Sequence, residues 1–132
     1  MPWAKIFLGD AMMDGAKTPN EPAVVVGKAY DLTIWLIQKV EHFPKSYRFS
    51  VGDRITKDVL DLLQTLVRCA YTSDKAKLLE VASAQTNSLR YLLRIAKDLH
   101  LMSIDSYGFS TGCVEEIGRM VGGWQKSVMR RA

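Results

Sequence analysis

Apolar residues that recur at alternating spacings of three and four are the strongest constraint on how this chain can fold. The clearest series runs along Leu78, Ala82, Gln85, Leu89, Leu92, Ala96 and Leu99. An earlier series consists of Ile55, Val59, Leu62, Leu66 and Cys69. A later series consists of Tyr107, Ser110, Val114, Ile117, Val121, Trp124 and Val128. Because such spacing places side chains on one face of an α-helix, each series predicts an amphipathic helix that must bury that face.

A fourth helix is expected before these three. It begins between Asn20 and Lys28, because Asn20 can cap a helix and Pro22 suits a first turn. It ends by Phe43, since Pro44 disfavours helical geometry at the residue before it.

Capping residues place the starts of the other helices. Ser50 opens the second helix, with Asp53 three residues later in a variant of the capping box. Ser73 caps the third helix, which runs from residue 74 to about residue 100, and the fourth begins near Ser103. Four amphipathic helices with short connections predict an all-α, antiparallel up-down-up-down four-helix bundle.

The length of 132 residues corresponds to one domain, which can bury a core without disulfides or metal. Residues 1–20 are predicted to be a flexible N-terminal arm and residues 21–132 the bundle. The arm is inferred from its helix breakers, Gly9, Asp10, Gly15, Pro19 and Asn20. No apolar run reaches the roughly 20 residues of a membrane span, and no signal peptide precedes the bundle. We therefore expect a cytoplasmic protein with no membrane partner.

Metal and cofactor sites have no support in the sequence. Cys69 and Cys113 form no CxxC pair and have no neighbouring histidine, so we expect them to be small buried side chains. There is no GxSxG sequence and no glycine loop for phosphate. The adjacent or nearby carboxylates fall off the apolar faces and are interpreted as solvated; they are Asp58, Asp61, Glu115 and Glu116. We therefore predict no cofactor, no metal and no catalytic residue.

Two features favour self-association. The first helix is apolar on nearly every side, through Leu32, Ile34, Trp35, Leu36 and Ile37. An all-round apolar helix in so small a bundle has to be covered by something, although a broad core face with one exposed tryptophan is the alternative. The last helix contains Gly108, Gly112, Gly118, Gly122 and Gly123. Each costs about 1 kcal/mol against alanine, which indicates close approach to a neighbouring helix or to another chain.

Basic residues gather in three places on this mildly basic chain, whose net charge is +4. The first group, Arg90, Arg94 and Lys97, shares one face of the third helix. The second group consists of Lys126, Arg130 and Arg131 near the C-terminus. A third cluster, around the first connection, interleaves aromatic residues and consists of Lys45, Tyr47, Arg48, Phe49 and Arg54. Such groups suit phosphate contact and base stacking, although a solvated face, with Asp98 paired to Arg94, is the alternative.

One pattern is shared with enzymes. Arg94 and His100 are spaced R-x5-H, loosely like the motif of the HEPN-type ribonucleases, which are also helical bundles. Six residues rotate through about 240° on a helix, so the two side chains diverge if the helix continues. A position in the last helical turn, where the helix dipole favours a cation, explains His100 without catalysis. The ribonuclease remains the less favoured alternative, beside a self-associating bundle with no nucleic-acid role.

Three blocks of sequence resemble the accessory variability determinant (Avd) family of diversity-generating retroelements. They are FPKSYRFSVGDRI (residues 43–55), SLRYLLRIAKDLHLMS (residues 88–103) and EEIGRMVGGWQKS (residues 115–127). The resemblance extends from about residue 24 to residue 129. It implies a four-helix bundle that assembles as a barrel-shaped homopentamer and binds the reverse transcriptase and the template RNA or its cDNA. The polymerase supplies the chemistry, so the resemblance implies a non-catalytic protein, with Arg90 and Arg94 on its basic binding surface.

Overall fold

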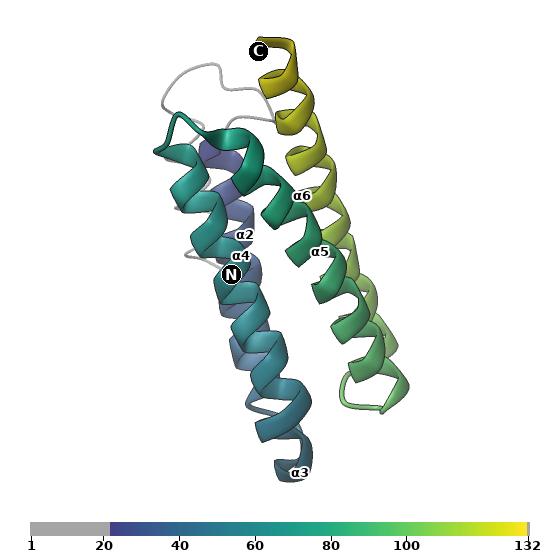
Figure 1. Cartoon of the computed structure of the whole chain (residues 1–132). Coiled ribbons are helices and arrows are strands. Elements are labelled where there is room, and N and C mark those ends of the chain that lie inside the picture. The colour runs from purple at the N-terminus through teal and green to yellow at the C-terminus, as the bar shows by residue number, and fades with distance from the viewer. Residues whose placement is uncertain (1–21, 132) are drawn as a thin grey trace.

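The computed structural model describes residues 22–131, and the elements in that range are helical. They are α2 (Pro22–Val40), α3 (Lys45–Tyr47), η1 (Arg48–Gly52), α4 (Asp53–Ala70), α5 (Lys75–Asp98) and α6 (Ile104–Arg131). Four of them are long, and η1 is a single π-helical turn that leads into α4 (Figure 1). The predicted all-α class is confirmed. The predicted arm, residues 1–20, lies outside the described residues.

Each long helix packs antiparallel against the next one in the chain. α2 contacts α4, α4 contacts α5 and α5 contacts α6, while α6 returns to α2 over a smaller contact. The α2–α4 and α5–α6 connections lie at one end of the bundle, and the α4–α5 connection lies at the other (Figure 1). This is the predicted up-down-up-down arrangement. The predicted assembly of such bundles into a barrel stays a prediction.

The buried faces of α4 and α6 are those that the spacing predicts. All five residues of the α4 series, from Ile55 to Cys69, are buried. On α6 the buried residues include Ser110, Val114, Ile117, Val121 and Trp124. The residues at the two ends of that series, 107 and 128, are half-buried against the core.

The predicted face of α5 is wrong at alternate positions. The buried residues of α5 are Leu79, Ala82, Thr86, Leu89, Leu93 and Ala96. Of the other predicted members, Leu78 and Leu92 are half-buried against the core, Gln85 is half-buried and Leu99 is exposed. The fully buried face keeps Ala82, Leu89 and Ala96 and is one residue later at the three positions between and before them, so it is turned only slightly; α5 packs there against both α4 and α6. The polar residue in this face is Thr86, whose hydroxyl donates to the Ala82 carbonyl over 2.8 Å.

The helical segment that leads into α4 begins before Ser50, where we predict its start. It starts at Lys45, directly after Pro44, and continues through the π-helical turn. The Ser50 hydroxyl donates to the Tyr47 carbonyl over 3.4 Å, so no capping box with Asp53 forms. The turn brings Gly52 against α2, where a Cβ atom would lie 2.8 Å from Val40 Cγ1. Glycine fits there because the Val40 side chain of α2 lies too close for a Cβ atom at position 52.

The other helix termini give mixed results. Ser73 does not cap α5, because the residue directly before the helix is Asp74. The Asp74 N–H donates to the Thr72 hydroxyl over 3.3 Å. The prediction for α6 is confirmed, because the Ser103 hydroxyl accepts from the Ser106 N–H over 3.1 Å. The first helix ends at Val40, as Pro44 requires. Its predicted cap, Asn20, is outside the described residues.

The glycines of α6 differ from one another in their surroundings. A Cβ atom at Gly118 would lie 3.1 Å from Arg90 Nη2 and 3.5 Å from Thr86 Cγ2, which is the close approach to a neighbouring helix that we predict. At Gly108, Gly112 and Gly122 a Cβ atom would meet nothing within 4 Å. For these three the prediction of a close neighbouring helix is wrong within the chain, and a second chain stays a prediction.

Trp35 is one of the five apolar α2 residues from which we predict self-association. It is half-buried, its ring lies 5.0 Å from that of Phe109 on α6, and Lys39 Nζ lies 5.0 Å from its ring centroid. The α2 face is thus partly covered within the chain. Over residues 22–131, no helix combines the length and the apolar character that a membrane crossing needs.

Candidate nucleic-acid interface

Arg90 is fixed across the contact between α5 and α6. Its Nε atom lies 2.6 Å from Glu115 Oε1, and its Nη1 atom donates to Asn87 Oδ1 over 2.7 Å. The guanidinium passes over Gly118, which has no side chain to displace it. The Arg90 side chain is 35% exposed. Arg90 therefore presents a positioned cation whose charge is already paired.

Arg94 and Lys97 share one carboxylate, that of Asp98. Arg94 Nε lies 4.0 Å from Oδ2, and Lys97 Nζ lies 3.4 Å from Oδ1. The Arg94 side chain is 63% exposed, against 33% for Lys97. An exposed pair at i,i+4 contributes only about 0.3–0.5 kcal/mol, so Arg94 can exchange Asp98 for a phosphate at little cost. Arg94 is the most accessible cation of the predicted group.

An open groove of about 420 Å³ runs between α5 and α6 beside these residues. Its α5 wall consists of Asn87, Arg90, Tyr91 and Arg94, and its α6 wall of Tyr107, Thr111 and Glu115. Lys97 does not line the groove, but its Nζ atom lies 4.8 Å from the centroid of the Tyr107 ring. The groove thus combines cations, aromatic rings and hydrogen-bonding groups.

Lys126, Arg130 and Arg131 lie well away from this groove. Glu115 is the groove residue nearest to them in sequence, and the eleven residues from Glu115 to Lys126 span about 16 Å along α6, at 1.5 Å per residue. All three basic side chains are exposed, and none forms an ion pair with another residue of the 22–131 range. The structure does not bring the two predicted groups together into one site.

The basic cluster of the first connection lies at the end of the bundle that also carries the α5–α6 connection (Figure 1). Lys45 and Arg54 are exposed, and the Phe49 side chain is 69% exposed. Arg48 is turned inward, since its Nη2 atom donates to the Phe43 carbonyl over 3.3 Å. Arg48 therefore stabilises the connection and is less accessible than Lys45 and Arg54.

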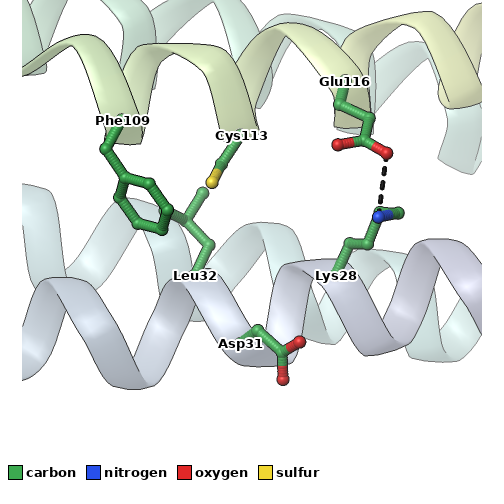
Figure 2. Close-up of a pocket in the computed structure, with 6 residues that line it drawn as sticks. All are labelled: Lys28, Asp31, Leu32, Phe109, Cys113 and Glu116. Atoms are coloured by element: carbon green, nitrogen blue, oxygen red, sulfur yellow. Dashed lines mark ion pairs between the residues drawn. The ribbon is translucent and has the colours of Figure 1, made fainter. Parts of the chain in front are cut away.

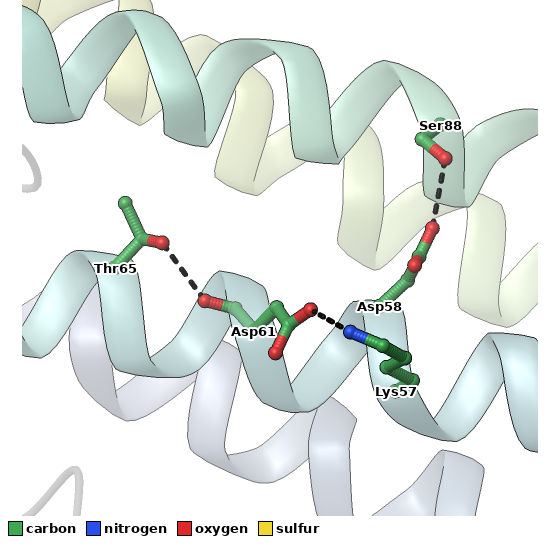
Figure 3. Close-up of polar contacts among 5 residues, drawn as sticks. All are labelled: Lys57, Asp58, Asp61, Thr65 and Ser88. Atoms are coloured by element: carbon green, nitrogen blue, oxygen red, sulfur yellow. Dashed lines mark hydrogen bonds and ion pairs between the residues drawn. The ribbon is translucent and has the colours of Figure 1, made fainter.

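The carboxylates that could have formed a catalytic pair all have structural partners. Asp58 Oδ2 accepts from the Ser88 hydroxyl over 2.8 Å, which links α4 to α5, and Asp61 pairs with Lys57 over 3.1 Å on the same helix (Figure 3). The Asp61 carbonyl also accepts from Thr65. Glu115 is held by Arg90, and Glu116 pairs with Lys28 of α2 over 2.8 Å.

His100 lies beyond the end of α5, not in its last turn as we predict. His100 has a φ of 60°, and its N–H donates to the Lys97 carbonyl. The N–H of Leu101 donates to the Ala96 carbonyl. This pattern is a Schellman motif, in which the residue with positive φ ends the helix. His100 lines a depression at this end of the bundle that Arg94 does not line. The structure therefore does not bring the R-x5-H pair together.

A small pocket of about 140 Å³ lies on the weaker contact, between α2 and α6. It is lined by Lys28, Asp31, Leu32, Phe109, Cys113 and Glu116, and the α6 side chains face α2 across it (Figure 2). Burial raises the pKa of Asp31 above its usual value, against the opposing effect of Lys28. Burial, and then the Glu116 carboxylate, raise the pKa of the Cys113 thiol. No group of metal-ligating side chains occurs in the described part of the chain.

The family of the chain is shown by a comparison of its sequence with protein-family models. A model described as bAvd-like matches residues 23–128, which extend from α2 into α6. The chain belongs to the bAvd-like family. No curated protein and no solved structure matches the chain. Membership confirms the resemblance to the Avd proteins and implies a non-catalytic accessory role in a diversity-generating retroelement.

The sequence pattern does not predict the two tyrosines of the groove in this bAvd-like chain. The apolar series of α5 does not include Tyr91, and that of α6 places Tyr107 only on the buried face, where it is half-buried. The exposed position of Tyr91 could have been found, because it falls between the buried residues Leu89 and Leu93 and directly follows Arg90. An aromatic residue off the apolar face of a basic helix is a recognisable pattern for base stacking.

Proposed function

We propose that this bAvd-like chain is a self-associating accessory protein that binds template RNA, or its cDNA, together with the reverse transcriptase of its retroelement. The observation that supports RNA binding most directly is the α5–α6 groove, where Arg94 is exposed and only loosely paired. Arg90, fixed by Glu115 and Asn87, adds a second cation at a defined position. Family membership supports the association with a reverse transcriptase.

The C-terminal group extends the proposed surface. Lys126, Arg130 and Arg131 are exposed on the last turns of α6, where cations are also favoured by the helix dipole. Because they lie about 16 Å or more from the groove along α6, they would contact a different segment of the same RNA. In a symmetric assembly of chains, both basic groups would be repeated around the axis.

The salt dependence of RNA binding tests the role of Arg94. Each phosphate contact of a single strand contributes about 0.7 to the slope of log K against log salt concentration. We expect Arg94→Ala to weaken binding and to lower that slope by about 0.7. The matched control is Lys77→Ala, which removes the same charge from an exposed position at the other end of α5. Equal effects of the two variants would contradict the assignment of the groove.

Association with the polymerase and with other copies of the chain needs separate measurements. We expect the chain to be retained by the immobilised reverse transcriptase of the same element, and we expect its solution mass to be that of a homopentamer. A monomeric mass would contradict self-association. An assembled chain with no affinity for RNA at low salt would instead identify a structural bundle without a nucleic-acid role.

A further inference from the structure

The α5–α6 groove contains an exposed aromatic ring beside its two arginines. Tyr91 lines the groove and is 66% exposed, although a tyrosine of a four-helix bundle can bury most of its ring in the core. Arg90 precedes it and Arg94 follows three residues later, on the same wall. Packing within the chain therefore leaves most of this ring accessible, next to two cations on the same wall of the groove.

We propose that the groove binds unpaired nucleobases of single-stranded RNA, with a base stacked on Tyr91 and the adjoining phosphates at Arg94. This inference rests on the proposed RNA-binding function and specifies which form of RNA is bound. In a duplex the faces of the bases are covered by their neighbours, whereas an unpaired base can turn outward onto an aromatic side chain. A stacking tyrosine thus distinguishes single strands from duplexes.

The second tyrosine of the groove has a different place. Tyr107 is half-buried, and Lys97 Nζ lies 4.8 Å from its ring centroid. The cation occupies the position over this ring that a stacked base would need. Tyr107 therefore forms the wall of the groove, and Tyr91 provides the free ring.

The charges of the groove suit a nucleotide. The carboxylate of Glu115 on the α6 wall is paired with Arg90 Nε over 2.6 Å. This pair leaves the exposed guanidinium of Arg94 as the accessible positive charge of the groove. A nucleotide matches this arrangement, because it carries one charged phosphate beside a neutral aromatic base. The volume of about 420 Å³ falls in the range of sites for small ligands, roughly 300–1,000 Å³.

Binding of labelled RNA by the full chain tests this inference. The probes are a single strand of roughly twelve nucleotides, within the usual site size, and the blunt duplex of the same sequence. We expect Tyr91→Ala to weaken binding of the single strand at least about fivefold, which corresponds to about 1 kcal/mol per stacked base. Binding of the duplex should change less than twofold, because no base is exposed in it.

Two control variants make the result specific to a stacking ring in the groove. Tyr91→Phe keeps the ring and should bind the single strand as the unmodified chain does. Tyr71→Ala removes a tyrosine that is 89% exposed in the α4–α5 connection, at the other end of the bundle, and should have no effect. Because Tyr91 is exposed, its replacement should leave the helix content, measured by circular dichroism, unchanged.

The possible failures are distinguishable. If Arg94→Ala weakens RNA binding and Tyr91→Ala does not, the stacking proposal is overturned and the proposed RNA-binding function stands. If Tyr91→Ala weakens single strand and duplex equally, the selectivity for unpaired bases is overturned. If the unmodified chain binds neither probe but binds an acidic peptide, both the stacking proposal and the RNA-binding function are overturned.

Discussion

Gly108 and Gly112 allow a quantitative test of how much space surrounds the first half of α6. A Cβ atom at either position would meet nothing within 4 Å. Glycine costs about 1 kcal/mol against alanine inside a helix, because it loses more backbone freedom on folding. The double variant Gly108→Ala/Gly112→Ala should therefore be stabilised by about 2 kcal/mol. For a chain of this length, that gain raises the midpoint of thermal unfolding by roughly 8 °C.

Thermal unfolding followed by far-ultraviolet circular dichroism measures this gain. Each variant should be unfolded at several protein concentrations, since self-association makes the midpoint depend on concentration. Gly118→Ala is the matched control on the same helix. Its Cβ atom would lie 3.1 Å from Arg90 Nη2, so the guanidinium must move and the gain should be smaller than for Gly112→Ala alone.

A lower midpoint for the double variant would refute the reasoning. It would mean that the space at Gly108 and Gly112 is filled in the assembled protein, which the single chain does not show. A simultaneous loss of solution mass would then place a second copy of the chain on this face. If the midpoint falls while the mass is unchanged, the helix itself does not tolerate the substitution.

Two further predictions concern polar groups at contacts between helices, the half-buried Asp31 and the exposed Ser88. Burial raises the pKa of Asp31, so the folded chain favours the protonated carboxyl. The stability of the fold is therefore fully present below the pKa of Asp31 in the unfolded chain, and part of it is lost as the pH rises through the raised pKa. Asp31→Asn should therefore unfold at a higher temperature than the unmodified chain at neutral pH, and the difference should shrink in acid; a constant difference would exclude this cause. Ser88→Ala removes the hydrogen bond to Asp58 between α5 and α4 and should lower the free energy of unfolding by about 1 kcal/mol in a urea titration. If Ser88→Ala is equally destabilising in an Asp58→Ala background, which removes the acceptor, the hydrogen bond is not responsible.

The face of α4 could be predicted residue by residue, whereas that of α5 could not. On α4, each of the five residues of the series directly follows a polar residue, which limits the apolar face on that side. On α5, leucines occur in adjacent pairs, at 78–79 and at 92–93, so two series one residue apart satisfy the same alternation. Spacing alone does not choose between them. The choice depends on α6, which packs beside α4 on α5, so that the buried members at 79, 86 and 93 are one residue later than predicted.

The start of α4 depends on contacts that are distant in sequence. Ser50 and Asp53 match a capping pattern, but the chain is already helical from Lys45. The π-helical turn places Gly52 against Val40, a residue of the preceding helix. A local pattern cannot include that contact. Ser103, in contrast, caps α6 through a hydrogen bond within its own first turn, and this cap could be predicted.

The candidate site was predicted as a row of cations and is observed as a groove between two helices. Periodicity places Arg90, Arg94 and Lys97 on one side of α5, but the residues that pair with Arg90 and complete the groove come from α6. Which α6 residues lie opposite is set by the register of two helices, and the sequence pattern contains no information on that register. The proposed stacking of a base on Tyr91 depends on this second wall, which makes the groove.

Helix α5 can serve both the core and the proposed RNA site because its two faces are stabilised independently. Leu89 and Leu93 are buried and fix the helix against its neighbours. Arg90 is tied to α6 by Glu115, so one cation of the groove is positioned before any ligand binds. Arg94 is left exposed, and its weak pair with Asp98 can be exchanged. Residues 90–94 thus contain the fixed cation Arg90, the exposed ring of Tyr91 and the weakly paired cation Arg94. This arrangement is suited to one nucleotide of a flexible strand.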